Sequence, residues 1–447
     1  MRTEIYDEEL SRVARNAVFG AYARRQSGMM FNLGRRERYR DGEAGTPEVP
    51  EGANRELKDI AENSRLNMCR VVVDAFTNGL QVSGFRSPDS SEDEPIWNWW
   101  NAQRLTARQT EVHEAAVTSG WSFVSVLPDE EEQPAARIWS ATEVDAVYDD
   151  PRNDMFPKHA TLWRCVPTGW AVYHVDSVSV RSMRVVEERG AAQVVLEDEW
   201  EHGVTYDGVP VCPVVRFRDK RTVGDYASTG EVEPIIPLQK SLNGVNFERL
   251  VASRFSVFNQ KVIIGWTAPR DQLLKASNSR VWTFEDHPSD VEVKSLPSSP
   301  ITPYNELIRE LKEQIALEAS VPIYQATGSV ANVSENTLAM VEKAHNAKLT
   351  LKRRVFGEAW ENVLRLAASL LGASISDTAE VLWKDTSPRP IGGVVDAIQK
   401  LSAQGVPVEE LIDLVPGISQ RRADTIRRKM ADARAEQEKL MLASPEE

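Results

Sequence analysis

The segment from Glu335 to Leu371 constrains this chain more than any other, because it contains no proline and only one internal glycine, Gly357. Such a stretch predicts one continuous helix, which Ser334 can cap. About 37 residues at about 1.5 Å each give a rod of about 55 Å. This is longer than a small domain is wide, so we expect the helix to be the spine of a subunit in a larger assembly.

Composition and charge narrow the class of protein. The chain has 447 residues, 41% of them hydrophobic, which is enough for two or three domains with a substantial core. Its net charge of -14 argues against a broad basic face that grips nucleic acid, but like-charge repulsion is compatible with DNA that slides past. We find no apolar run of about 18 residues and no signal peptide, so no membrane partner is expected. The cysteines Cys69, Cys165 and Cys212 lie far apart, which favours a reducing cytoplasm.

The first half of the sequence predicts an α+β fold. Helical apolar spacing runs from Asn54 to Phe76 and from Ile96 to Ser119, where Gly120 ends the pattern. Alternating residues then predict a series of strands. These are Trp121–Val126, Ala135–Trp139, Ala160–Val166, Trp170–Val175, Ser179–Val186, Gln193–Glu199 and Val211–Phe217, with turns at Arg189-Gly190 and Asp207-Gly208.

The second half is mainly helical. Pro237 to Phe258 predicts a helix with Pro237 in its first turn, and a helix from Thr302 to Ser320 has Thr302 as its cap. Between them lies a β-prone segment followed by a loop region, and Val321-Pro322 ends the second helix. Three shorter amphipathic helices are expected at Val394–Ala403, Val408–Val415 and Gln420–Leu442.

Several segments, taken in order, resemble the portal (head-to-tail connector) family of tailed bacteriophages over nearly the whole chain. They are Asn63–Asp74, Trp97–Asn101 followed by His113–Ala115 and Gly120–Val124, Glu231–Asn246, and Val321-Pro322 with Gly328 and the long helix. Their order and spacing carry the resemblance. It implies a portal-type subunit with an α/β wing at 1–230, stem helices at 231–258 and 301–321, a small clip at 259–300, a channel loop at 322–333, a spine helix at 334–372 and a helical crown at 373–447.

The resemblance also implies a function. Members form dodecameric rings at one capsid vertex, through which double-stranded DNA is packaged, retained and ejected. The implied partners are terminase, a head-completion adaptor, and the major capsid and scaffolding proteins. The protein is then expected in the virion, and in the host cytoplasm during assembly, with no catalytic, cofactor-binding or metal-binding residues.

The residues that such a ring would use follow from the same mapping. The channel-loop candidates are Thr327, Gly328, Ser329, Val330, Ala331 and Asn332, which are small and uncharged, although the residues alone also fit an ordinary surface loop. Glu306, Glu310 and Glu313 fall on one helix face, either as an acidic collar facing the channel or as a solvated face with internal ion pairs. Candidates for docking at the clip are Trp266, Arg270, Asp271 and Asp286.

Other charged and aromatic groups have two interpretations. The basic residues Lys343, Lys348, Lys352, Arg353 and Arg354 of the long helix suit solvent or ion pairing, or contact with an acidic neighbouring subunit. Asp149 to Asp154 suits a turn better than a cation site, because the spacing is not that of an EF-hand. Trp97, Trp99 and Trp100 suit core or interface anchors better than a platform for stacked bases.

The main alternatives are of other classes. Leu411 to Ile426 resembles a DNA-binding helix-hairpin-helix, but Ser419 stands where a second glycine is needed. A carboxylate-metal nuclease that holds DNA with this hairpin is one alternative, because its acidic ligands come from dispersed positions. Another capsid-vertex structural protein is the second. We find no P-loop, no GxSxG elbow and no HExxH motif, which disfavours the packaging ATPase and common hydrolases.

Overall fold

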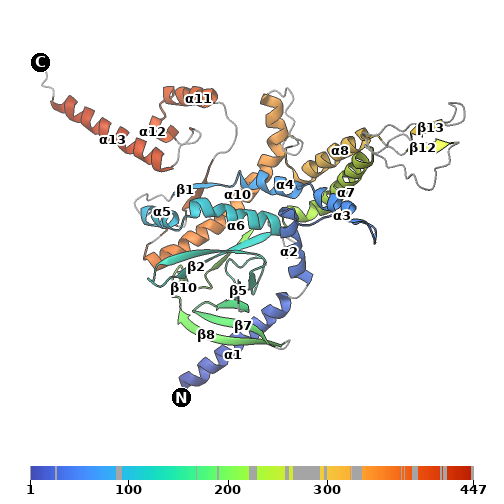
Figure 1. Cartoon of the computed structure of the whole chain (residues 1–447). Helices are drawn as coiled ribbons and strands as arrows, with labels where there is room; N and C mark the ends of the chain where they lie inside the picture. The colour runs from blue at the N-terminus through green and yellow to red at the C-terminus, as the bar shows by residue number, and fades with distance from the viewer. Residues whose placement is uncertain are drawn as a thin grey trace. The chain divides into compact units, whose positions relative to one another are not determined.

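The computed structural model (Figure 1) describes residues 2–25, 28–86, 93–167, 169–188, 191–220, 229–256, 261–264, 292–295, 300–322, 324, 335–373, 375–376, 378–384, 391–412, 415 and 420–443. The chain forms two compact units. The first consists of Met1–Arg36, Val73–Glu231 and Asn346–Glu447, and the second of Glu37–Val72 and Val232–His345. The chain therefore leaves and re-enters the first unit twice.

A five-stranded antiparallel sheet forms one layer of the first unit, in the order β4-β5-β6-β7-β8. Its strands are β4 (Val144–Val147), β5 (His159–Val166), β6 (Gly169–Val175), β7 (Ser179–Glu188) and β8 (Ala191–Glu201). The helix α1 (Arg2–Arg25) packs Val18 and Ala21 against Trp163 and Met183 on one face of this sheet. The four longer strands confirm the predicted strands, whereas β4 is too short to show a period in the sequence.

A second, three-stranded sheet has the order β11-β2-β3, with strands β11 (Val214–Arg218), β2 (Trp121–Pro128) and β3 (Pro134–Ser140). Its Phe123 and Trp139 share a core with Leu162 and Val175 of the larger sheet. The short strands β9 (Thr205–Tyr206) and β10 (Val209–Pro210) form a hairpin. Both turn residues, Asp207 and Gly208, have positive φ, as the predicted Asp-Gly turn requires.

The prediction of one helix from Ile96 to Ser119 is wrong. Two helices occupy this stretch, α5 (Asp93–Ala102) and α6 (Leu105–Ser119), separated at Arg104, whose φ of 56° is left-handed. The reversal brings Trp100 back over the start of α6, where its indole N–H donates to Thr106 Oγ1 at 3.1 Å. A tertiary packing requirement therefore overrides a helical pattern that continues through the sequence. Gly120, with φ of 102°, ends α6 as predicted.

The long helix α10 (Glu335–Leu371) is continuous, which confirms the strongest prediction from the sequence. Within the first unit, Phe356 and Trp360 of α10 are fully buried against Phe217 of β11. The indole N–H of Trp360 donates to His113 Nε2 at 2.9 Å. A further pair of strands, β1 (Val82–Arg86) and β14 (Glu380–Trp383), is antiparallel.

The second unit contains two long helices that pack against each other, α7 (Val232–Ser256) and α8 (Thr302–Ala319). The strands β12 (Lys261–Ile264) and β13 (Glu292–Ser295) pair with each other. The helix α7 begins five residues before Pro237, which stays inside the helix with an exposed ring. The helix α8 has Ile301 as its N-cap and no side-chain capping bond, so the predicted role of Thr302 is wrong.

The predicted helix from Asn54 to Phe76 is also two helices, α3 (Arg55–Asn63) and α4 (Met68–Thr77). The break is held by buried amides of α7. Asn243 Oδ1 accepts the backbone N–H of Leu66 at 3.0 Å, and Gln239 Oε1 accepts that of Met68 at 2.9 Å. These partners lie more than 170 residues away. The local signal is Asn67, which precedes α4 and accepts the backbone N–H of Arg70 at 2.9 Å, as a helix cap does.

Four further helices complete the described chain. They are α2 (Gly28–Arg40) near the start and α11 (Ile391–Ala403), α12 (Val408–Leu411) and α13 (Gln420–Ala443) towards the end. The last three confirm the predicted run of short helices. Val408–Val415 is described as helix only to Leu411.

Candidate functional site

The acidic face of α8 consists of Glu306, Glu310 and Glu313. All three lie away from the buried side of the helix, which is formed by Ile308, Leu311, Ile315, Ala316 and Ala319. Glu306 and Glu310 are exposed, while Glu313 is half-buried and accepts a hydrogen bond from Arg309 Nε at 2.9 Å. The face therefore combines two solvated carboxylates with one internal ion pair. Its role as a channel-facing surface stays a prediction.

The other residues that the sequence singles out for a channel lie outside the described residues. These are the loop candidates Thr327 to Asn332 and the clip candidates Trp266, Arg270, Asp271 and Asp286. The structure does describe where the loop begins. Ser320 adopts a left-handed conformation with φ of 58°, and its N–H bonds to the last turn of α8. The helix therefore ends just before Val321-Pro322, as predicted.

Two of the basic residues of α10, Lys348 and Lys352, belong to a buried charge cluster. Lys352 is only 3% exposed, and its ammonium group donates to Glu231 Oε1 at 2.7 Å and to Asp219 Oδ1. Lys348, one turn earlier, is 30% exposed and donates to Glu231 Oε2 at 2.6 Å. Both ammonium groups lie about 5 Å from the ring centre of Phe76, at 5.2 and 5.0 Å. Of the two interpretations of these lysines, ion pairing within the chain is the one observed.

The two carboxyl groups of the cluster differ in their electrostatics. Burial acts to raise the pKa of Glu231, but the ammonium groups of Lys352 and Lys348 outweigh it, so that this pKa is lowered. Burial raises the pKa of Asp219, and Lys352 offsets only part of the effect. The difference follows from geometry, because Glu231 binds a lysine with each oxygen, whereas Asp219 Oδ2 has no hydrogen-bond partner within the described part of the chain.

Backbone contacts hold both carboxylates at the end of α6. The N–H of Asp219 donates to Gly120 O at 2.9 Å, and the N–H of Glu231 donates to Val117 O at 2.7 Å. Gly230 has φ of 66°, and a Cβ there would lie 2.5 Å from Thr118 O. The sequence does contain one signal for this cluster, because Lys352 occupies the apolar stripe of α10 between Leu349 and Phe356, and a lysine buried there needs a partner.

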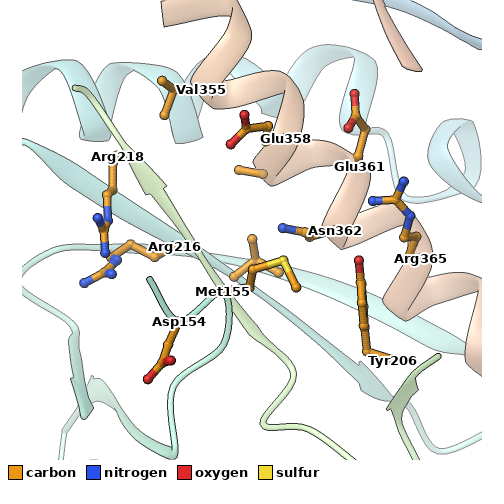
Figure 2. A pocket seen from close by; sticks show the side chains of 12 residues that line it. Asp154, Met155, Tyr206, Arg216, Arg218, Val355, Glu358, Glu361, Asn362 and Arg365 are labelled. Carbon is orange, nitrogen blue, oxygen red and sulfur yellow. The ribbon is translucent and has the colours of Figure 1, made fainter. Parts of the chain in front are cut away.

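A cleft with a volume of about 240 Å³ opens in the first unit, lined by residues of β11 and α10. Figure 2 shows Glu358, Asn362 and Arg365 of α10 on one side and Arg216 of β11 on the other. Arg216 Nη2 donates to Pro151 O at 2.8 Å, and its guanidinium lies 3.9 Å from the ring centre of Tyr148. These contacts hold the cleft wall in place.

Three further sequence interpretations have clear outcomes. Asp149 to Asp154 forms a turn, in which Asp150 N donates to Asp154 Oδ2 at 2.6 Å. Trp99 and Trp100 are buried, which makes them core residues rather than a stacking platform. In the hairpin between Leu411 and Ile426, residues 413–414 and 416–419 lie outside the described residues. In the parts of the chain that the structure describes, no His, Cys, Asp and Glu group is arranged to hold a metal ion, and no helix is long and apolar enough to cross a membrane.

A comparison with family models decides which proteins this chain belongs with. The model for phage portal proteins of the SPP1 Gp6-like type matches residues 62–440, which includes elements of both units. The chain belongs to the SPP1 Gp6-like phage portal protein family. It is thus a portal protein of a phage-like particle, a structural virion component that connects head and tail, and the resemblance inferred from the sequence is confirmed.

Individual relatives of this portal protein are distant. The portal protein of Mycobacterium phage L5 is 23% identical over 391 residues, 80% of this chain and 77% of the relative. That of Mycobacterium phage D29 is 22% identical over 359 residues, 75% and 72% of the two chains. Among solved structures, a chain of the virion of the native gene transfer agent (GTA) particle has a TM-score of 0.43 at 14% identity, and one from the neck of the empty GTA particle has 0.46 at 13%. Each match covers 82% of this chain and 94% of the other.

Proposed function

We propose that this portal protein assembles into a dodecameric ring at one capsid vertex and forms the channel for double-stranded DNA during packaging, retention and ejection. The family match over residues 62–440 is the observation that carries the proposal. The exposed apolar side chains Leu317 on α8 and Leu351 on α10 support it, because each presents more than half of its surface to solvent in the single chain. Neighbouring copies would remove this surface from water.

We propose a separate role for each part of the subunit. Residues 1–230 form the wing, α7 and α8 the stem, 334–372 the spine and 373–447 the crown. The segment 259–300 is the clip, where terminase and later the adaptor dock, with Trp266, Arg270, Asp271 and Asp286 as contact candidates. The loop from Thr327 to Asn332 narrows the channel, because small uncharged side chains allow close approach of many copies without holding phosphates.

The acidic face of α8 gives the channel proposal its most specific form. If Glu306, Glu310 and Glu313 face the axis, twelve copies create a negative collar that DNA passes without adhesion. The ion pair between Arg309 and Glu313 reduces the charge of the face but leaves Glu306 and Glu310 solvated. The collar is therefore expected to weaken as salt rises.

Assembly is tested by mass photometry and negative-stain microscopy of the purified chain. Twelve chains of 50.1 kDa give a particle of about 600 kDa with an open centre. A species of 50 kDa alone at micromolar concentration contradicts the proposal. A closed particle without a channel favours another vertex protein.

The collar is tested by passing duplex DNA through single rings held in a membrane pore and timing the current blockades. We expect Glu306→Gln, Glu310→Gln and Glu313→Gln together to lengthen the dwell time at low salt. The matched control changes Glu130, Glu131 and Glu132, exposed carboxylates in the turn before β3, and leaves the dwell time unchanged. Equal dwell times for both triple variants would show that the acidic face of α8 does not line the channel.

A further inference from the structure

Among the described side chains of α13, few are buried against the rest of the protein. The helix is 24 residues long, yet among its described side chains Ala423 is the one that is buried, at 1% exposure. Ile426 and Met430 follow Ala423 at helical spacing and are half-buried, so a narrow stripe rests on the protein. The residues from 431 to 435 are all exposed. Most of the described side chains of this helix are therefore available to a partner.

The charge of α13 is opposite to that of the chain. Residues 421–434 contain six basic and two acidic side chains, a net charge of +4, in a protein whose net charge is -14. The basic residues are Arg421, Arg422, Arg427, Arg428, Lys429 and Arg434. Negatively charged surfaces on the rest of the chain repel a polyanion, so this helix is a local exception to the overall charge.

The charged residues of α13 occur in an order that does not stabilise the helix. A helix is stabilised by acidic residues in its first turn and by basic residues in its last turn. The first turn of α13 has no acidic residue and contains Arg421 and Arg422, and the last turn has no basic residue. Neighbouring like charges at 427–429 add repulsion. An external anion would offset the unfavourable positive charge at the start of the helix and reduce the repulsion between neighbouring cations. The arrangement therefore favours anion binding over a purely solvated face.

The exposed cations share one side of the helix. At about 100° per residue, Arg428 and Lys429 lie about 140° and 240° around the axis from the buried Ala423, and Arg422 about 260°. All three are exposed, and no ion pair involves them within the described chain. Arg422 and Lys429 are seven residues apart, which is about 10.5 Å along the axis. We call Arg422, Arg428 and Lys429 the basic face of α13.

We propose that the basic face of α13 binds the phosphate backbone of double-stranded DNA, as a contact separate from the channel. The proposal rests on the proposed function only in the choice of double-stranded DNA as the polyanion. Three guanidinium or ammonium groups on one rigid face contact phosphates without reading sequence. No hairpin amides are needed, so the contact does not depend on the glycine that Ser419 replaces. The rival occupant is an acidic surface of a second copy of this chain.

The test compares two triple variants of the full-length protein. The first is Arg422→Gln, Arg428→Gln and Lys429→Gln, since glutamine favours helix about as well as lysine and arginine. The matched control is Arg152→Gln, Lys158→Gln and Arg164→Gln, which removes the same charge from exposed positions of the first unit. Circular dichroism checks the helix content of both, and mass photometry checks their assembly. Fluorescence anisotropy with a 30-base-pair duplex then gives the affinity between 50 and 200 mM salt.

We expect the α13 variant to bind duplex DNA at least about 100-fold more weakly at 50 mM salt. The slope of log K against log salt is negative. Each lost phosphate contact makes this slope about 0.9 less steep, so the loss of three makes it about 2.7 less steep. The ratio of the two affinities then changes about 40-fold between 50 and 200 mM salt. The control is expected to keep the slope of the parent.

Other outcomes overturn the proposal. They are no DNA binding by the parent at 50 mM salt, or equal losses for the two variants. Loss of assembly by the α13 variant at unchanged DNA affinity assigns the face to a neighbouring copy instead. Failure of the parent to form a ring contradicts the proposed function but leaves the affinity comparison intact, so the two failures are distinguishable.

Discussion

Replacing Lys352 with methionine tests how far the first unit depends on its buried charge cluster. Methionine fills most of the space of lysine, but it leaves the buried carboxylates Asp219 and Glu231 with Lys348 alone. Removing one partner of a buried ion pair destabilises a protein by about 3 to 5 kcal/mol. At about 2 °C of melting temperature per kcal/mol for a unit of this size, the variant is expected to melt about 6 to 10 °C lower at pH 8.

Lys348→Met is the matched control. It is the same residue type on the same helix and binds the same Glu231, but its side chain is 30% exposed against 3% for Lys352. Water can therefore take over part of its role, and the expected loss is about 1 kcal/mol. Calorimetric melting of the two variants and the parent, under identical conditions, measures both effects.

The pH dependence identifies the cause. Burial raises the pKa of Asp219 to about 6, above its ordinary 3.8. A raised pKa in the folded state favours the protonated carboxyl, so the contribution of Asp219 to stability is greatest below about pH 4 and is lost as pH rises through about 6. Protonation removes the unpaired charge, and the deficit of Lys352→Met is therefore expected to be smaller at pH 5 than at pH 8.

Two results would refute this reasoning. One is a Lys352→Met variant that melts within about 2 °C of the parent at pH 8, and the other is a larger loss for Lys348→Met. A double variant with Asp219→Asn adds a check, because removing both charges leaves no unpaired ion and should recover part of the loss. No recovery would place the cause in packing rather than charge.

Three further predictions concern backbone, amide and histidine groups. Gly230→Ala forces a Cβ to 2.5 Å from Thr118 O at φ of 66°, and calorimetry is expected to show a loss of about 2 to 3 kcal/mol. Asn243→Ala removes the acceptor of the Leu66 N–H, so that stability falls by about 1 to 3 kcal/mol and this amide exchanges faster with solvent. Burial lowers the pKa of His174 to about 4, so the unfolded chain binds a proton that the folded chain does not, and stability falls by about 2 kcal/mol from pH 7 to pH 5. Urea unfolding of His174→Gln at both pH values should show this contribution removed.

The pattern of residues close in sequence predicts individual elements well. The helix from Glu335 to Leu371 and four of the five strands of the larger sheet follow from local propensity and period. The left-handed Gly120 and the Asp207-Gly208 turn follow from the conformations that these residues allow. In each case the energy that decides the structure comes from residues within a few positions, so the sequence carries the information locally.

Helix breaks were predicted poorly for the opposite reason. No side-chain capping bond marks the break at Arg104, whereas at Ser64 to Asn67 the side chain of Asn67 caps the second helix by accepting the Arg70 N–H. The first break serves the packing of Trp100, and the second is held by Gln239 and Asn243 of α7. Distant side chains contribute at both places, because Trp100 also packs edge-on against Trp360 of α10, with ring centres 4.8 Å apart.

The family, and hence the identity as a portal protein, could be inferred from the sequence because the order of elements survives at about 23% identity. The charge of the chain, its long helix and the three glutamates on one face of α8 were likewise evident from the sequence. Only the tertiary structure decided that Lys352 is neutralised by Asp219 and Glu231, which lie 133 and 121 residues away. It also decided that β1 pairs with β14, some 300 residues later. A lysine in an apolar stripe indicates that a buried partner is needed. Which carboxylate pairs with it depends on contacts between segments far apart in the chain, and the periodicity of the sequence does not predict those contacts.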